Sequence, residues 1–206
     1  MIEYTIRKSG AGVVLFVVVL LLSGCLSRSS PKVTYYSFLN VQQLGEAQSI
    51  ASLQDIKIGI GPVEIPDSLK RTQIATRQHG NQYEFSEFNR WAGVLENDLT
   101  SVLGDNLGYL LGVEKIGFFP WLHHFKPTYR VIVNVLRLDG AIDGEAVLSV
   151  RWAVSDAKGK DYLVGKKSDY RQPLEDASYA ALIKAESQLI AKLSKEIAGE
   201  IAALVK

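Results

Sequence analysis

Cysteine is almost absent from this sequence, since Cys25 is the only one among 206 residues. A chain with a single thiol forms no internal disulfide and builds no metal site from cysteines alone. Histidine is also scarce, and the three histidines are His79, His123 and His124. The last two are adjacent, so on an extended segment their side chains point to opposite faces. We therefore expect neither a disulfide nor a bound metal.

An excess of charge of one sign is lacking as well. The chain has 23 basic and 22 acidic side chains, which gives a formal net charge of +1 and no electrostatic footprint for nucleic acid. The sequence contains no P-loop and no Gly-x-Ser-x-Gly nucleophile motif. Gly59-Ile-Gly61 begins like a dinucleotide fingerprint, but Glu64 stands where the third glycine belongs. We predict a protein that is not an enzyme, needs no cofactor and does not bind nucleic acid.

The longest hydrophobic run lies near the N-terminus, at residues 11–22, and is too short to span a bilayer, which needs about 20 residues. Arg7 and Lys8 precede this run and small residues follow it, which is typical of a secretory signal. The signal ends on Leu22, Ser23, Gly24 and Cys25, and this tetrapeptide resembles the bacterial lipobox. The pattern therefore predicts a lipoprotein.

The lipobox resemblance implies a specific modification of Cys25. Its thiol becomes a thioether to diacylglycerol, the peptide bond before it is cleaved, and the new amino group receives an N-acyl chain. Three acyl chains hold a protein at a membrane far more firmly than one. Leu26, rather than an aspartate, follows the cysteine, which by resemblance favours the periplasmic face of the outer membrane. We predict a signal peptide over 1–24, a lipidated tether over 25–34 and a single domain over 35–206.

Hydrophobic periodicity predicts the elements of that domain. Alternating and β-branched segments predict strands, and apolar residues at three-to-four spacing predict two helices. The expected strands cover 33–39, 56–60, 73–77, 83–85, 129–138, 146–154 and 162–164, and the expected helices cover about 89–110 and 179–204. Strands followed by a helix, a three-strand meander and a final helix indicate an α/β domain with a mixed sheet covered by its helices.

Three segments resemble a known family, the ABC-type transport auxiliary lipoproteins of the paraquat-inducible protein C type. Residues 59–77 read Gly-Ile-Gly-Pro-Val-Glu-Ile-Pro-Asp-Ser-Leu-Lys-Arg-Thr-Gln-Ile-Ala-Thr-Arg and match its first signature. Residues 89–107 match its Arg-Trp-Ala helix, although Gly93 and Val94 stand where the family usually has an acidic residue and proline. Residues 179–198 match its C-terminal helix.

This resemblance implies a fold and a role. The fold is a three-layer α/β/α domain. The role is that of a docking or structural component that works with an MCE-domain protein and its inner-membrane partner to move lipids between the two membranes of Gram-negative bacteria. Arg71, Arg77 and Trp91 are then candidate contacts to the partner. In the alternative interpretation, Trp91 fills the core and the arginines pair with local carboxylates.

The apolar segment Phe118–Leu122 has no evident core to fill. It either covers the core, meets a partner or a second copy of this chain, or touches lipid, and Trp121 is its candidate contact residue. Two other functions therefore stay open beside docking. The domain is a lipid-binding module with its own apolar cavity, or it is a general envelope-assembly lipoprotein.

Overall fold

The computed structural model describes residues 31–46, 48–78 and 81–205. The predicted signal peptide, the lipobox residues Leu22–Cys25 and His79 lie outside this part of the chain. Residues from Val33 onward belong to one compact unit. Its elements are β1 (Thr34–Tyr36), β2 (Ile58–Glu64), the 3-10 turn η1 (Asp67–Leu69), β3 (Gln73–Arg77), β4 (Tyr83–Trp91), α2 (Leu95–Leu111), β5 (Ile116–Phe118), β6 (Tyr129–Gly140), β7 (Glu145–Ser155), β8 (Tyr162–Pro173) and α3 (Tyr179–Leu204).

The larger sheet is mixed and has five strands in the order β5-β2-β6-β7-β8. Strand β2 runs parallel to both β5 and β6, whereas β6, β7 and β8 form an antiparallel meander. The expected hairpin between β6 and β7 is present, but its turn covers only residues 141–144, where the Gly144 amide donates to the Ala141 carbonyl. Asp139 and Gly140 still belong to β6.

A smaller sheet has three strands in the order β1-β4-β3. Strand β4 extends to Trp91, so the prediction of a helix from about residue 89 was wrong at its start. Trp91 lies four positions before Leu95, which imitates helical spacing, although its ring reaches the core from the end of a strand. Helix α2 begins after Val94 and ends at Gly112, which adopts the left-handed conformation (φ 61°) that favours glycine as a helix stop.

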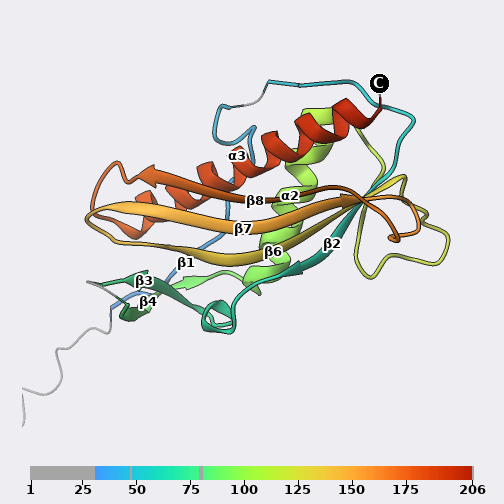
Figure 1. Ribbon diagram of the computed structural model, residues 1–206. Coiled ribbons are helices and arrows are strands. Elements are labelled where there is room, and N and C mark those ends of the chain that lie inside the picture. The colour runs from blue at the N-terminus through green and yellow to red at the C-terminus, as the bar shows by residue number, and fades with distance from the viewer. Residues whose placement is uncertain (1–30, 47, 79–80, 206) are drawn as a thin grey trace, which may run out of the picture. The chain divides into compact units, whose positions relative to one another are not determined.

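Both long helices lie on the same face of the larger sheet (Figure 1). Helix α3 packs on β7 and β8, helix α2 packs on β2 and β5, and the two helices contact each other. The predicted α/β class, the mixed sheet and the two long helices are confirmed. The helices nevertheless form one layer rather than the two outer layers of an α/β/α arrangement, because their mutual contact requires a shared face.

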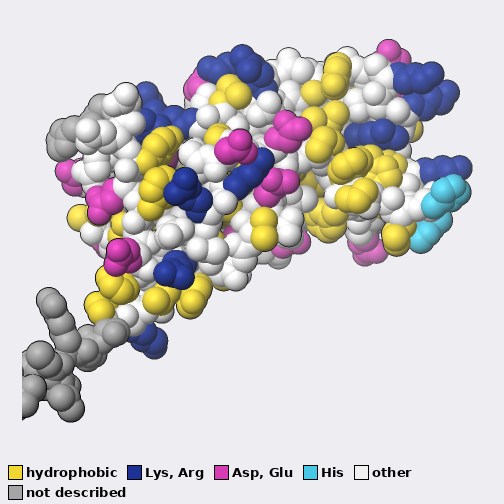
Figure 2. All heavy atoms as spheres, turned by 90° about the horizontal axis from the view of Figure 1, so that it is seen from below, with side chains coloured by type: hydrophobic (Ala, Val, Ile, Leu, Met, Phe, Trp, Pro, Cys, Tyr) yellow, Lys and Arg dark blue, Asp and Glu magenta, His cyan; other side chains and the backbone are white. Residues whose placement is uncertain are grey.

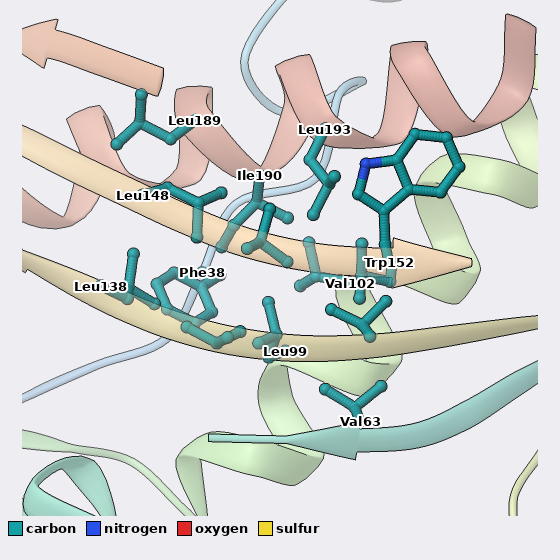
Figure 3. Close-up of a cluster of buried hydrophobic side chains, with 14 of the residues drawn as sticks. Phe38, Val63, Leu99, Val102, Leu138, Leu148, Trp152, Leu189, Ile190 and Leu193 are labelled. Atoms are coloured by element: carbon teal, nitrogen blue, oxygen red, sulfur yellow. The ribbon is translucent and has the colours of Figure 1, made fainter. Parts of the chain in front are cut away.

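The core lies between this sheet face and the two helices (Figure 3). Alternate residues of β6 and β7 point into it, as the pleat of a strand requires. Its members include Val131, Val133, Val135, Leu148, Val150 and Trp152 from the sheet, Leu99, Val102 and Leu103 from α2, and Leu189, Ile190 and Leu193 from α3. Burying each large side chain of this kind stabilises the fold by roughly 1.5–3 kcal/mol.

Polar side chains of the helices hold the segment that follows β1. The Phe38 amide donates to Asp98 (2.9 Å), the Leu39 amide to Ser187 (3.0 Å) and the Val41 amide to Asn106 (2.8 Å). The expected strand over 33–39 is therefore only partly formed. Beyond Tyr36 the backbone bonds to helix side chains instead of to a neighbouring strand.

Candidate functional site

The loop between β5 and β6 lies directly on glycines of the larger sheet. A Cβ atom on Gly59 would come within 2.9 Å of the Trp121 ring, and the Phe125 ring occupies the space where a Cβ on Gly117 would stand. The Phe119 amide also donates to the Ile60 carbonyl (2.9 Å). The loop is therefore held on the strands by ring packing and a backbone hydrogen bond.

Trp121 is half-buried within this loop and faces its own fold. Its ring meets the Phe119 ring edge-on at a centroid distance of 5.3 Å, and the Arg130 guanidinium lies 5.1 Å from its ring centre. Its neighbours are more exposed: 44% for Phe118, 53% for Phe119 and 68% for Leu122. The structure thus places Trp121 as the residue that supports the loop, while its neighbours present apolar surface to solvent.

A surface groove of about 640 Å³, here called the loop groove, lies beside Phe118 and Phe119. Pro62 and Glu64 of β2 form one wall, and Phe118–Pro120 close the groove. The other wall comes from α2 and consists of Glu96, Asn97, Thr100 and Ser101. Two segments that the sequence singled out separately, the one beginning at Pro62 and the one beginning at Phe118, therefore meet at one place.

A second groove of about 520 Å³, here called the β1 groove, lies beside the smaller sheet. Its lining is mainly apolar and consists of Tyr35, Ile65, residues 70–72 and residues 90–96. Arg71 lines this groove, and its guanidinium lies 4.4 Å from the centre of the Phe85 ring. Figure 2 shows hydrophobic side chains gathered at two places on one face, beside the histidines and near the start of the described chain.

Arg77 has a different environment, because it joins the two sheets. Its Nη2 atom lies 2.8 Å from Asp139 Oδ2. The Tyr83 hydroxyl donates to the same carboxylate (2.9 Å), and Arg137 Nη2 lies 2.7 Å from Oδ1. Burial by itself would raise the pKa of Asp139, but hydrogen bonds from Arg77, Arg137 and Tyr83 outweigh it and hold that pKa below its usual value. The guanidinium of Arg77 is thus engaged inside the fold, as the alternative interpretation held.

Trp91 also follows the alternative interpretation. It is 6% exposed, and its ring packs against that of Phe38 at a centroid distance of 4.9 Å. Trp91 is also one of the residues that line the β1 groove. Of the three candidates, Arg71 is exposed, Arg77 is partly buried in its ion pair and Trp91 is buried.

Sequence reasoning did not single out Glu186, a fully buried acid on α3. Burial, and secondarily the negative charge of Asp139, raises the pKa of Glu186 to about 8. Its Oε2 atom has no hydrogen-bond partner among the described residues. A signal was available, because Glu186 occupies a position in the apolar stripe of the predicted C-terminal helix, where a charge is unusual.

Within the described ranges, no group of three or more histidine, cysteine or acidic residues is arranged to hold a metal ion. Neither α2 nor α3 is long and apolar enough to cross a membrane. The loop groove combines aromatic side chains with acidic, amide and hydroxyl groups, whereas the β1 groove combines apolar side chains with cationic ones. The fold is thus an α/β domain that carries two surface grooves.

The chain belongs to the family of ABC-type transport auxiliary lipoprotein components, whose model matches residues 36–198. The family predicted from the three sequence segments is thus confirmed. A crystal structure of an uncharacterised protein is similar with a TM-score of 0.68 at 21% identity, covering 83% of this chain and 99% of that one. A protein from Xanthomonas campestris is similar with a TM-score of 0.67 at 9% identity, covering 83% and 94%. At these identities the likeness concerns the fold alone. No curated protein sequence matches this chain significantly.

Proposed function

We propose that this transport auxiliary lipoprotein is anchored through Cys25 at the periplasmic face of the outer membrane and docks an MCE-type lipid transport assembly there. Its partners are an MCE-domain protein and the associated inner-membrane component. Family membership supports a role in transport, and the lipobox residues Leu22, Ser23 and Gly24 before Cys25 support the anchor.

The loop groove is the observation that carries the docking proposal. It combines exposed Phe118 and Phe119 with a recess beside α2, and exposed Leu122 follows in the same loop. Interfaces commonly place aromatic anchors at their centre, where a few residues supply most of the binding energy. A loop fixed on a rigid sheet also presents its side chains with little entropy left to lose.

The same geometry favours docking over the alternative of a lipid-binding module. The space between the sheet and the helices is filled by the side chains of the core, and both recesses are surface grooves. The other alternative, a general role in envelope assembly, does not require the exposed residues of the loop to bind one particular partner. A loop variant that loses a defined partner therefore separates docking from both.

The direct test measures binding of the acylated protein to the MCE-domain protein of the same bacterium, both in detergent. We expect Leu122→Asp and Phe119→Asp each to weaken binding about tenfold or more, because a carboxylate placed in an apolar contact must lose its water. Tyr162→Asp is the matched control, since Tyr162 is equally exposed (70%) but lies at the start of β8. Its affinity should be unchanged.

Trp121→Ala tests the support of the loop separately. Removing the ring frees the loop from Gly59, so binding should fall although Trp121 offers little surface of its own. Melting temperatures of all variants must stay within a few degrees of wild type for the comparison to count. If the loop variants fold and bind the MCE-domain protein as wild type does, the loop groove is not the docking face. If the wild-type lipoprotein itself does not bind, the docking proposal fails.

A further inference from the structure

We infer that the β1 groove is a membrane-contact surface that rests on the phospholipid bilayer holding the lipid anchor. The inference depends on the proposed acylation of Cys25 but concerns a different face from the loop groove. It assigns a role to Arg71 and to the exposed apolar residues around it. Docking through the loop groove does not involve these residues.

The first argument is the apolar surface itself. Tyr35 and Val94 stand on the rim of the groove and are 61% and 65% exposed. Ile65, Trp91 and Leu95 lie beneath them as part of the buried core. Large apolar side chains that gather around one recess, rather than lying scattered, mark a surface that is covered in the working protein.

The second argument is the kind of polar group on the rim. Lys70, Arg71 and Arg90 line the groove, with Glu96 as the acid among them. Lys70 is paired with Asp67, a residue of η1, at 2.8 Å. Aromatic residues and long cationic side chains suit the bilayer interface, because their apolar parts enter the acyl boundary while their polar ends reach the headgroups. The charges are partly balanced, so apolar contact is the main contribution and anionic lipid adds to it.

The third argument is the length of chain between the anchor and the groove. Tyr35 lies ten positions after Cys25. At about 3.3 Å per residue, ten residues reach at most about 33 Å. The acyl chains therefore hold the rim of the β1 groove near the headgroups at a high effective concentration, so even a weak apolar contact is occupied. This proximity favours lipid over a freely diffusing protein as the occupant.

A pair of single-cysteine reporters tests the inference. Because the thiol of Cys25 is consumed by acylation, a cysteine introduced elsewhere is the only one that a thiol-reactive fluorophore labels. We would label Val94→Cys and, as a control of equal exposure, Tyr162→Cys. The acylated proteins are reconstituted into phosphatidylethanolamine–phosphatidylglycerol vesicles that carry a lipid with a spin-label quencher near the headgroup. Quenching at position 94 should exceed that at position 162 at least threefold.

A second pair of variants tests which groups make the contact. Adding Tyr35→Ser and Arg71→Glu to the Val94→Cys protein should lower the quenching at least twofold. Adding Lys167→Glu, at an exposed cation of β8, should leave it unchanged. The reduction should be larger in vesicles that contain phosphatidylglycerol than in vesicles of zwitterionic lipid alone.

Each remaining outcome decides against the inference in a recognisable way. Equal quenching at the two positions, or stronger quenching at 162, means that the groove does not face the bilayer. Protection of the label at 94 from aqueous quencher without lipid quenching, rising with protein concentration, means that a second copy covers the groove. Intact-mass measurement on the same sample shows whether Cys25 is acylated. If acyl chains are absent, the anchor proposal fails, whereas if they are present and position 94 is unquenched, only this inference fails.

Discussion

Two buried carboxylates on neighbouring elements have opposite surroundings. Asp139 of β6 receives hydrogen bonds from two arginines and a tyrosine, which compensate its desolvation. Glu186 of α3 lies in the field of that negative charge, and no described group donates to its Oε2 atom. The first acid is therefore kept ionised and the second is kept protonated at neutral pH. Each makes stability depend on pH, but in opposite directions.

Replacing Glu186 should change how stability varies between pH 5 and pH 8. In the unfolded chain this acid ionises near 4.5, whereas in the folded protein its pKa is about 8. Between these values the unfolded state has released a proton that the folded state retains, so wild-type stability falls as the pH rises. Glu186→Gln cannot ionise and should lose this decline, which amounts to at most about 1.4 kcal/mol per pH unit. Urea unfolding at pH 5, 6.5 and 8 measures it.

The slope with pH, rather than the absolute stability, is the informative quantity for Glu186→Gln, because a buried amide carries a constant cost of its own. Glu114→Gln is the control, since Glu114 is exposed. It should follow the wild-type slope. A Glu186→Gln variant that declines as steeply as wild type would show that the buried acid is ionised in the folded protein.

Arg77 should matter for stability rather than for partner binding. Arg77→Met leaves the carboxylate of Asp139, which is 1% exposed, with fewer donors. We expect a loss of about 2–3 kcal/mol, somewhat less than for a pair with no other partner, because Arg137 and Tyr83 remain. The folded pKa of Asp139 is depressed. Its contribution is therefore present above the unfolded value of 3.8 and is lost as the pH falls through the folded value, so the deficit should shrink in acid.

Arg171→Met provides the comparison, since Arg171 is paired with Glu145 but is 66% exposed. Exposed pairs contribute little, so its unfolding midpoint in urea should stay close to that of wild type. Equal losses in the two variants would contradict the structural role assigned to Arg77. So would a selective loss of partner affinity in an Arg77→Met protein of normal stability.

At the scale of the elements, the loop of the candidate site depends on glycines in the strands beneath it. Gly117→Ala would place a methyl group inside the Phe125 ring, so the loop must shift. We expect a loss of about 1–3 kcal/mol, the usual cost of overpacking. Gly165→Ala, in the same sheet, has nothing within 4 Å of the new Cβ and should be neutral or slightly stabilising. Denaturant unfolding compares the two, and equal effects would contradict close packing of the loop.

The elements also show where sequence reasoning succeeds and where it stops. Strands β6 and β7 and helix α3 were predicted closely, because one face of each is buried and its apolar residues recur at the proper period. Strand β8 was predicted only to Val164 but extends to Pro173, since its later part is a polar edge strand without an apolar stripe. The segment after β1 was predicted to continue as a strand, but its backbone amides donate to side chains of α2 and α3 instead of to a neighbouring strand.

At the scale of the whole domain, local pattern identified pieces of the candidate site but not their arrangement. Residues 62–77 and 118–122 were recognised as surface candidates, yet which parts of them meet depends on β2 and β5 being neighbours in the sheet. The ion pair of Arg77 with Asp139 joins positions 62 residues apart, which no local pattern reveals. The β1 groove likewise combines residues from β1, the segment after η1 and the start of α2. These arrangements depend on contacts between elements that are distant in the sequence.

The proposed division into an anchor and an independently folded domain leads to a last prediction, on Cys25→Ser. A serine hydroxyl lacks the thiolate character on which acylation depends, so diacylglycerol should not be attached and the signal should stay uncleaved. The precursor would then be held only by its apolar run. The domain should still fold, because its core is drawn from residues at and beyond Phe38. Intact-mass measurement of membrane fractions and a thermal melt of the purified precursor check both parts.

Ser29→Ala, a change outside the lipobox, is the control for Cys25→Ser and should be processed and acylated like wild type. A Cys25→Ser chain that is cleaved at the same bond, or a mature wild-type N-terminus without acyl chains, would contradict the lipobox assignment. A precursor with a much lower melting temperature would instead contradict the independence of the domain. In that case the anchor segment contributes to folding, and the tether cannot be treated as a simple connection between membrane and domain.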